Sequence, residues 1–83
     1  MFHTYILYSS LLDSYYVGAC GDDLNGRLRR HLSKHRGYTS KAKDWHIVYS
    51  ESFNSWAEAL TRERVIKSWK SRLMIDSLIN NQL

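Results

Sequence analysis

Two aromatic-rich segments near the start of the chain constrain its fold more than any other feature. Residues 2–9 (FHTYILYS) and 15–20 (YYVGAC) are rich in the β-branched and aromatic side chains that strands favour. The polar turn between them, residues 10–14, is short enough to join two strands as an antiparallel hairpin. Residues 46–53 (HIVYSESF) have the same character and predict a third strand.

Helical patterns fill the stretches between and after these strands. Asp22 and Asp23 can cap the start of a first helix. Helical spacing is then carried by Leu24, Leu28, His31, Leu32 and His35. Gly37 is the expected stop of this helix, and residues 38–45 (YTSKAKDW) are expected to form a basic loop.

The second helix has the clearest start signal in the chain. Ser55 and Glu58 form an S-x-x-E capping box, which predicts a helix from Trp56 to about Lys70. Residues 73–79 predict a short third helix that closes the core. The expected order is β-β-α-β-α-α, and a three-stranded antiparallel sheet flanked by helices, an α+β fold, is the natural way to bury these apolar faces.

Length and composition fit one small domain spanning residues 1–83. A chain of 83 residues supports one modest core, and 43% hydrophobic residues exclude a disordered protein. The single cysteine, Cys20, cannot form an internal disulfide, and no apolar run approaches the roughly 20 residues that span a bilayer. We therefore expect a cytoplasmic protein.

The balance of charge indicates the kind of partner. Twelve Lys and Arg residues against eight Asp and Glu residues give a net charge of +4, which suits a polyanion such as nucleic acid. Many small basic proteins bind no nucleic acid, so the charge alone does not decide the matter.

A carboxylate stands among the apolar residues of the second predicted helix. On a helical wheel Trp56, Ala59, Leu60 and Ile66 define one face, and Glu63 falls near its middle. Burying a carboxylate is costly unless it is paired or binds a cation. Glu63 is therefore either a metal ligand or a salt-bridged residue at the edge of the face.

The first predicted helix carries a similar pair. Arg27 and His31 are spaced i, i+4, so they lie on one side of the helix and could face a phosphate together. The alternative is an ordinary amphipathic helix with both residues beside its apolar stripe. Gly26, inside the same helix, costs roughly 1 kcal/mol relative to alanine, and either a close backbone approach or simple tolerance explains it.

Other candidates carry less chemistry. His3, His35 and His46 have no metal-ligand spacing, and Cys20 has no evident base beside it and is expected to be a small buried residue. Most of the six tyrosines are expected to lie in the core or on the sheet, because tyrosine is a preferred strand residue.

The ordered set of these motifs resembles the GIY-YIG nuclease superfamily, and more narrowly its small stand-alone bacterial members of the UPF0213 type. The resemblance covers about residues 3–72, and no single motif within it is decisive. The segments that carry it are residues 3–5 (HTY), 16–18 (YVG), 24–31 (LNGRLRRH), 37–39 (GYT) and 58–69 (EALTRERVIKSW). In the first of them only the tyrosine matches the family's Gly-Ile-Tyr.

The resemblance implies a metal-dependent endonuclease that hydrolyses phosphodiester bonds. Glu63 would hold one divalent ion, Mg²⁺ or Mn²⁺, and Arg27 would stabilise charge on the phosphate. Tyr5 or Tyr16 would take a proton from the attacking water, with the other orienting water or phosphate, and His31 would assist.

The resemblance also implies a nucleic-acid partner, with DNA ranked ahead of RNA. Backbone contacts are expected from Arg29, Arg30, Lys34, Arg36, Lys41 and Lys43, for which a solvated helix face is the alternative. The chain has no room for a separate targeting domain, so specificity would come from nucleic-acid shape, a second copy of the chain or a protein partner. A binding module without useful catalysis, or a protein-interaction domain, are the competing functions.

Overall fold

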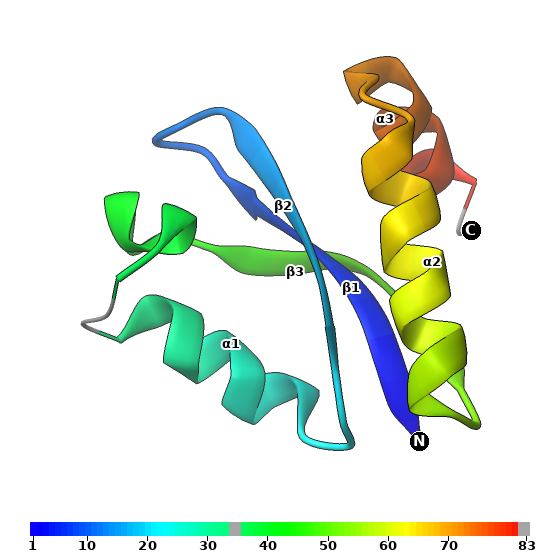
Figure 1. Ribbon diagram of the computed structural model, residues 1–83. Helices are drawn as coiled ribbons and strands as arrows, with labels where there is room; N and C mark the ends of the chain where they lie inside the picture. Colours follow the sequence, from blue (N-terminus) through cyan, green and yellow to red (C-terminus); the bar gives the residue numbers. More distant parts are fainter. Residues whose placement is uncertain (34–35, 82–83) are drawn as a thin grey trace.

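The computed structural model describes residues 1–33 and 36–81 and confirms the predicted α+β fold and its element order (Figure 1). The elements are β1 (Phe2–Ser9), β2 (Ser14–Cys20), α1 (Leu24–Leu32), the 3₁₀ helix η1 (Tyr38–Lys41), β3 (His46–Phe53), α2 (Trp56–Ser68) and α3 (Arg72–Asn80). No helix in the described part of the chain has the length and apolar character needed to cross a bilayer.

The three strands form one antiparallel sheet in the order β2-β1-β3, so β1 is the central strand. Tyr5 in the middle of β1 is opposite Gly18 on β2 and Ser50 on β3. The register with β3 shifts between Ile6 and Leu7. The backbone at the centre of β1 is therefore flanked by a strand on each side.

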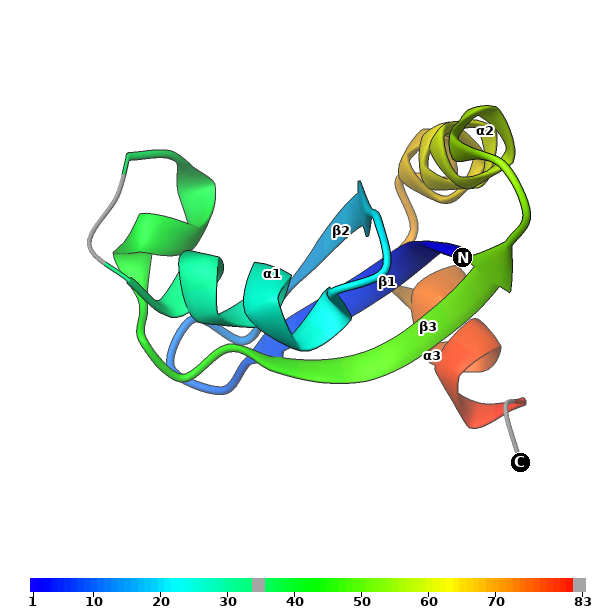
Figure 2. The same ribbon diagram turned by 90° about the horizontal axis from the view of Figure 1, so that it is seen from below.

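Each face of the sheet is covered by a different helical layer, and the strands pass between α1 and α2 in Figures 1 and 2. Alternate β1 residues supply the two layers because side chains of a strand point to opposite faces in turn. Around α1 the buried cluster is Tyr5, Leu7, Cys20, Ala42 and Trp45. Around α2 and α3 it is Ile6, Val17, Tyr49 and Ile66.

The first helix begins as predicted but ends earlier. The carboxylate of Asp23 accepts a hydrogen bond from the Gly26 amide at 2.8 Å. A methyl group at Gly26 would lie 2.0 Å from Asp23 Oδ2, so the glycine makes room for this cap. The prediction that Gly37 stops the helix is wrong, since α1 ends at Leu32 and Gly37, with φ of 112°, precedes η1. His35 lies outside the described residues.

The second helix is capped as its sequence predicts. The Ser55 hydroxyl accepts a hydrogen bond from the Glu58 amide at 3.1 Å. Ala59 and Ile66 are fully buried, as the helical wheel requires. Trp56 is the exception to that wheel, because its residue is 44% exposed. The helix ends at Ser68, before the expected Lys70, whose φ of 49° is incompatible with a continuing helix.

Gly18 of β2 lies close to the Tyr5 side chain of the neighbouring strand. A methyl group on Gly18 would lie 2.5 Å from the Tyr5 hydroxyl oxygen and 2.7 Å from Tyr5 Cζ. Tyr5 is 1% exposed and has no free space to move into. The glycine of the Tyr16-Val17-Gly18 segment is thus required by the tyrosine opposite it.

We therefore predict that Gly18→Ala destabilises the protein by about 1–3 kcal/mol, the usual cost of overpacking a core. Urea unfolding followed by circular dichroism measures the effect. Gly21→Ala is the matched control, because nothing lies within 4 Å of a methyl group there, and it should change stability by no more than about 0.5 kcal/mol. Equal stability of the two variants would contradict this packing role for Gly18.

Candidate active site

Three of the predicted site residues meet between β1 and α1. The Tyr5 hydroxyl lies 2.8 Å from His31 Nε2, and Arg27 Nε donates to the same hydroxyl at 3.4 Å. Tyr5 comes from the central strand, whereas Arg27 and His31 come from successive turns of α1. The i, i+4 spacing therefore places both α1 side chains on the sheet side of the helix, around one hydroxyl.

A fourth residue, Thr39 of η1, holds His31 from its other ring nitrogen. Thr39 Oγ1 lies 2.9 Å from His31 Nδ1, and both residues are buried. Because Arg27 Nε–H can only donate, the Tyr5 oxygen accepts from it. The direction of the Tyr5–His31 and His31–Thr39 bonds follows from which ring nitrogen of His31 carries the hydrogen. Sequence reasoning singled out Thr39 only as part of the Gly37-Tyr38-Thr39 match.

Tyr16 lies beside this network without joining it through a described hydrogen bond. Its ring is 5.0 Å from the His31 ring, edge to face, and is stacked 6.5 Å from Tyr38 at an interplanar angle of 14°. Tyr16 lines a cavity of about 530 Å³ together with Arg27, His31 and Thr39. Tyr16, and not Tyr5, is the tyrosine of the expected pair that borders the cavity.

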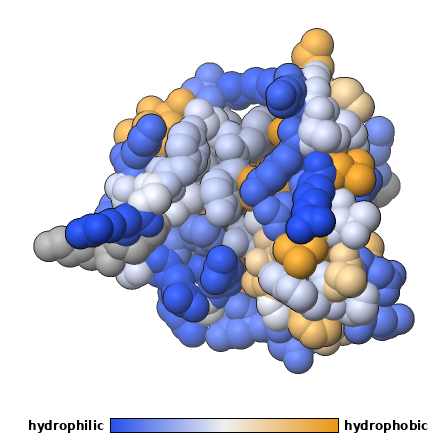
Figure 3. Space-filling view, in the orientation of Figure 1, coloured by the Kyte–Doolittle hydropathy of each residue, from blue (hydrophilic) through white to orange (hydrophobic). Residues whose placement is uncertain are grey.

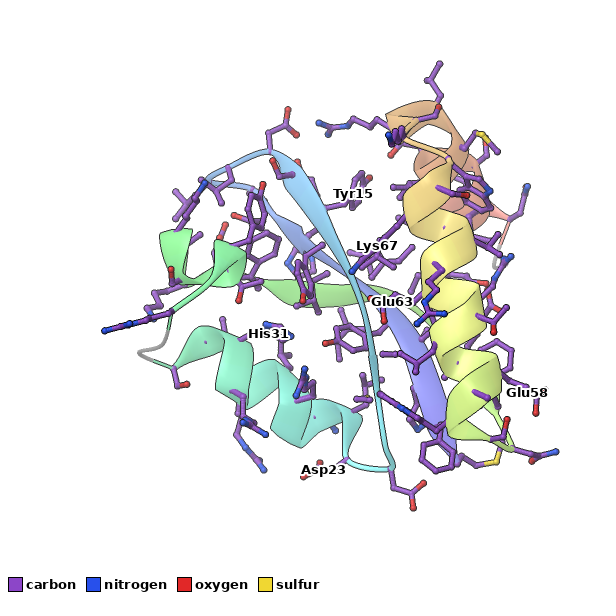
Figure 4. The ribbon with its side chains drawn as sticks, in the orientation of Figure 1. Tyr15, Asp23, His31, Glu58, Glu63 and Lys67 are labelled. Atoms are coloured by element: carbon purple, nitrogen blue, oxygen red, sulfur yellow. The ribbon has the colours of Figure 1, made fainter. Side chains whose placement is uncertain are left out.

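Glu63 approaches from α2, on the other side of β2. Its side chain is 18% exposed, and its Oε2 accepts a hydrogen bond from Lys67 Nζ at 2.6 Å. Lys67 Nζ in turn lies 5.9 Å from the centre of the Tyr16 ring. In Figure 4, Glu63 and Lys67 point from α2 toward the strands and His31 points toward them from α1.

The salt-bridged alternative for Glu63 is therefore present in the structure, and Lys67 connects it to Tyr16. Sequence reasoning did not single out Lys67. Its signal was the i, i+4 spacing of a glutamate followed by a lysine, which is the favourable orientation for an ion pair on a helix.

The carboxylate chemistry fits one hard divalent ion. Among the described residues no group of three or more His, Cys, Asp or Glu side chains could enclose a metal, and His3, His46 and Cys20 join no such group. Glu63 is a partly exposed carboxylate whose described partner is the Lys67 ammonium. Magnesium commonly uses one or two carboxylates and keeps water and phosphate oxygens as its other ligands.

Basic side chains line the cavity and the surface near α1, which is hydrophilic in Figure 3. Arg30 and Arg36 line the cavity with Arg27, and Arg29 lines the neighbouring one. Lys41 lies 5.0 Å from the Tyr38 ring centre, and Lys43 Nζ donates to the Ser33 carbonyl at 2.9 Å. Lys34, also an expected phosphate contact, lies outside the described residues.

Burial dominates the protonation of Tyr5. Loss of hydration raises its pKa to about 12, against the smaller opposing effect of the Arg27 hydrogen bond. The Tyr5 hydrogen bond in turn raises the pKa of Arg27, which remains a cation. Burial also raises the pKa of the Cys20 thiol, which lies in the core as expected. Tyr5 is thus a neutral hydrogen-bonding group at physiological pH.

Comparison with known proteins gives a family match over most of the chain. The family described as the GIY-YIG catalytic domain matches residues 1–76. No curated protein and no solved structure matches the chain significantly.

The Tyr5 network makes a prediction about stability and pH. Tyr5→Phe should cost about 1–3 kcal/mol at neutral pH, because it removes the buried hydrogen bonds that the hydroxyl makes with His31 and Arg27. The folded pKa lies above the ordinary value, so this stabilisation is complete below about pH 10 and is lost as the pH rises toward 12. The stability gap between wild type and Tyr5→Phe should therefore narrow by up to about 1.4 kcal/mol per pH unit above pH 10.

Urea unfolding of both proteins, from about pH 8 to about pH 11, measures this gap. The difference between the two proteins removes the contributions of the other tyrosines. A gap that is constant across this range would show that Tyr5 does not hold its proton in the way the structure indicates.

Proposed function

This chain belongs to the GIY-YIG catalytic domain family, and we propose that it is a metal-dependent endonuclease that hydrolyses phosphodiester bonds in DNA. Domains of this family are generally endonucleases, so a nucleic-acid-binding hydrolase is the expected class. The finer proposal is a structure-selective or weakly specific enzyme acting at one site per chain.

The observation that carries the proposal is the hydrogen-bonded group of Tyr5, Arg27 and His31 beside an arginine-lined cavity. The Tyr5 bond engages Arg27 through Nε and leaves the two terminal nitrogens of the guanidinium to donate to a phosphate. Because the guanidinium is held in place before substrate arrives, it can stabilise the charge that develops on the phosphate without reorganising. Arg30 and Arg36 border the same cavity and would attract the neighbouring backbone.

The two tyrosines suit different roles. Tyr5 is buried and hydrogen-bonded to both Arg27 and His31, so we assign it the positioning of these two side chains. Tyr16 borders the cavity, so we assign it the contact with the attacking water, whose proton its phenolate form would accept. His31, fixed by Tyr5 and Thr39, holds the wall of the cavity next to the Tyr16 ring.

Glu63 would hold one divalent ion, Mg²⁺ or Mn²⁺. Such an ion, when bound, would polarise the scissile phosphate and stabilise the leaving oxygen. Without a bound ion, the Lys67 ammonium neutralises the Glu63 carboxylate. One site per chain would cut one strand, so cutting both strands of a duplex would need two copies.

A nucleic-acid-binding module without useful catalysis is the second candidate. The Glu63–Lys67 ion pair favours it, because the carboxylate proposed as a metal ligand already has a cationic partner. The basic surface would serve this module equally well, since backbone contacts require no chemistry.

The proposal predicts that Glu63→Gln lowers cleavage by at least about 100-fold in Mg²⁺ or Mn²⁺, because losing the metal ligand removes several kcal/mol of charge stabilisation. The assay uses single-stranded, duplex, flap and branched DNA and matching RNA. Glu58→Gln is the control, since glutamine also completes a capping box and Glu58 is exposed. Binding without cleavage by the wild type would favour the second candidate, and full activity of Glu63→Gln would refute the metal role.

The ion pair makes a separate prediction about metal affinity. Lys67→Met removes the cation that occupies the Glu63 carboxylate, so Mn²⁺ affinity measured by isothermal titration calorimetry should rise about two- to tenfold. Arg64→Met removes one positive charge from an exposed position of the same helix and controls for long-range electrostatics. Equal affinity in the two variants, or weaker binding by Lys67→Met, would show that Lys67 does not compete with the metal.

A further inference from the structure

Trp56 is a large aromatic side chain that the fold leaves half exposed. It is the first residue of α2, and the residue is 44% exposed. Its ring lies 6.0 Å from the Phe2 ring at an interplanar angle of 55°, so Phe2 supports it from one side. The other tryptophans differ, since Trp45 is buried and Trp69 is half-buried in the cluster around α2 and α3.

Trp56 borders the largest cavity described in the structure, of about 840 Å³, at the start of α1. Arg27, Arg30 and Ser33 line both this cavity and the cavity bordered by Tyr16. The two cavities are therefore neighbours that share a boundary of two guanidinium groups. A ligand held at that boundary by a phosphate can extend from it toward Trp56.

The cavity bordered by Trp56 carries charges of both signs, since Arg27, Arg29 and Arg30 line it together with Asp22 and Asp23. Asp22 and Asp23 line the same cavity, and both carboxylates already have partners. Asp22 pairs with the N-terminal amine, which lowers its pKa, and Asp23 caps α1. The guanidinium groups can hold a phosphate, and the carboxylate oxygens can accept hydrogen bonds from the exocyclic amines of a nucleobase beside it.

Tyr38, the other exposed aromatic residue near the site, is less available. It is 42% exposed, but its ring is stacked on Tyr16 and has the Lys41 ammonium 5.0 Å from its centre. Among the described residues, Phe2 is the one aromatic side chain whose ring lies against Trp56. Trp56 is consequently the aromatic surface on which a ligand can stack.

We propose that Trp56 is a stacking platform for an unpaired nucleobase next to the phosphate that Arg27 holds. The proposal rests on the proposed nuclease function and deepens it, because a base within a regular duplex is already stacked on its neighbours and cannot lie on Trp56. The substrates selected by this site are nucleic acids with an unpaired nucleotide beside the bond that is cut.

Binding measured without divalent metal tests the platform, since no ligand is then cut. The probes are a short single-stranded DNA, a blunt duplex of the same sequence, and a single strand of the same length whose sugars carry no bases. Wild type should bind the normal strand about 5- to 100-fold more tightly than the base-free strand, the range that one stacked base provides. Tryptophan fluorescence should be quenched by the normal strand and not by the base-free strand.

The variants assign this difference to one side chain. Trp56→Ala should reduce the preference for the normal strand to less than about twofold, leave duplex binding unchanged and lose the quenching. Trp56→Phe keeps a ring and should retain most of the preference. Leu73→Ala is the control at an unrelated exposed apolar residue on α3, 79% exposed, and should behave as the wild type.

Each result decides the matter. Loss of the preference in Trp56→Ala with retention in Trp56→Phe supports the platform. Equal binding of normal and base-free strands by the wild type overturns the platform, and so does an unchanged preference in Trp56→Ala. Neither result contradicts the nuclease proposal. Absence of binding to any probe at low salt overturns the proposed function and the platform with it. If Trp56→Ala is unstable, equal binding of the two strands by the wild type still overturns the platform, and loss of the preference in a stable Trp56→Leu variant supports it.

Discussion

The buried hydroxyl of Tyr5 is the point on which the site depends. It lies over Gly18 of the neighbouring strand, accepts a hydrogen bond from Arg27 and is bonded to His31. A buried hydroxyl without partners is costly, so α1 must dock with both side chains turned toward the sheet. The hydrogen bonds that offset the cost of burying the Tyr5 hydroxyl also fix the Arg27 guanidinium and the His31 imidazole at the cavity wall. Stability and site geometry are therefore set by one group of contacts in this protein.

Side chains from the two helical layers meet at the edge strand β2. Tyr16 faces the α1 side of the sheet, where its ring contacts His31. Lys67 reaches the same ring from α2 while it holds Glu63. A central strand could not be approached in this way, because another strand would lie on each side of it. Side chains of helices packed on opposite faces of the sheet therefore both approach the Tyr16 ring.

Local patterns were sufficient to predict most of the fold. The aromatic segments at 2–9 and 46–53 became β1 and β3 with the same bounds, and the Ser55–Glu58 pair caps α2. Strand propensity and caps act over a few neighbouring residues, so one sequence contains their signal. The placement of Arg27 and His31 on one side of α1 followed from helical spacing in the same way. The family resemblance, confirmed by the match over residues 1–76, added the expectation that they share one site with Tyr5 and Tyr16.

What sequence patterns missed depends on contacts between distant segments. The early end of α1, the Thr39 bond to His31 and the exposure of Trp56 are set by how the loop and α2 pack, and no local period encodes them. Trp56 illustrates the difference. A helical wheel counts it as apolar and assigns it to the core, yet at the first position of α2 it is 44% exposed, with Phe2 of β1 on one side. Two explanations account for an aromatic side chain left half exposed beside an arginine-lined cavity: a ligand stacks on it, or packing against Phe2 alone requires it. In the first case nucleic acid binds more tightly when it carries bases, and in the second case it does not.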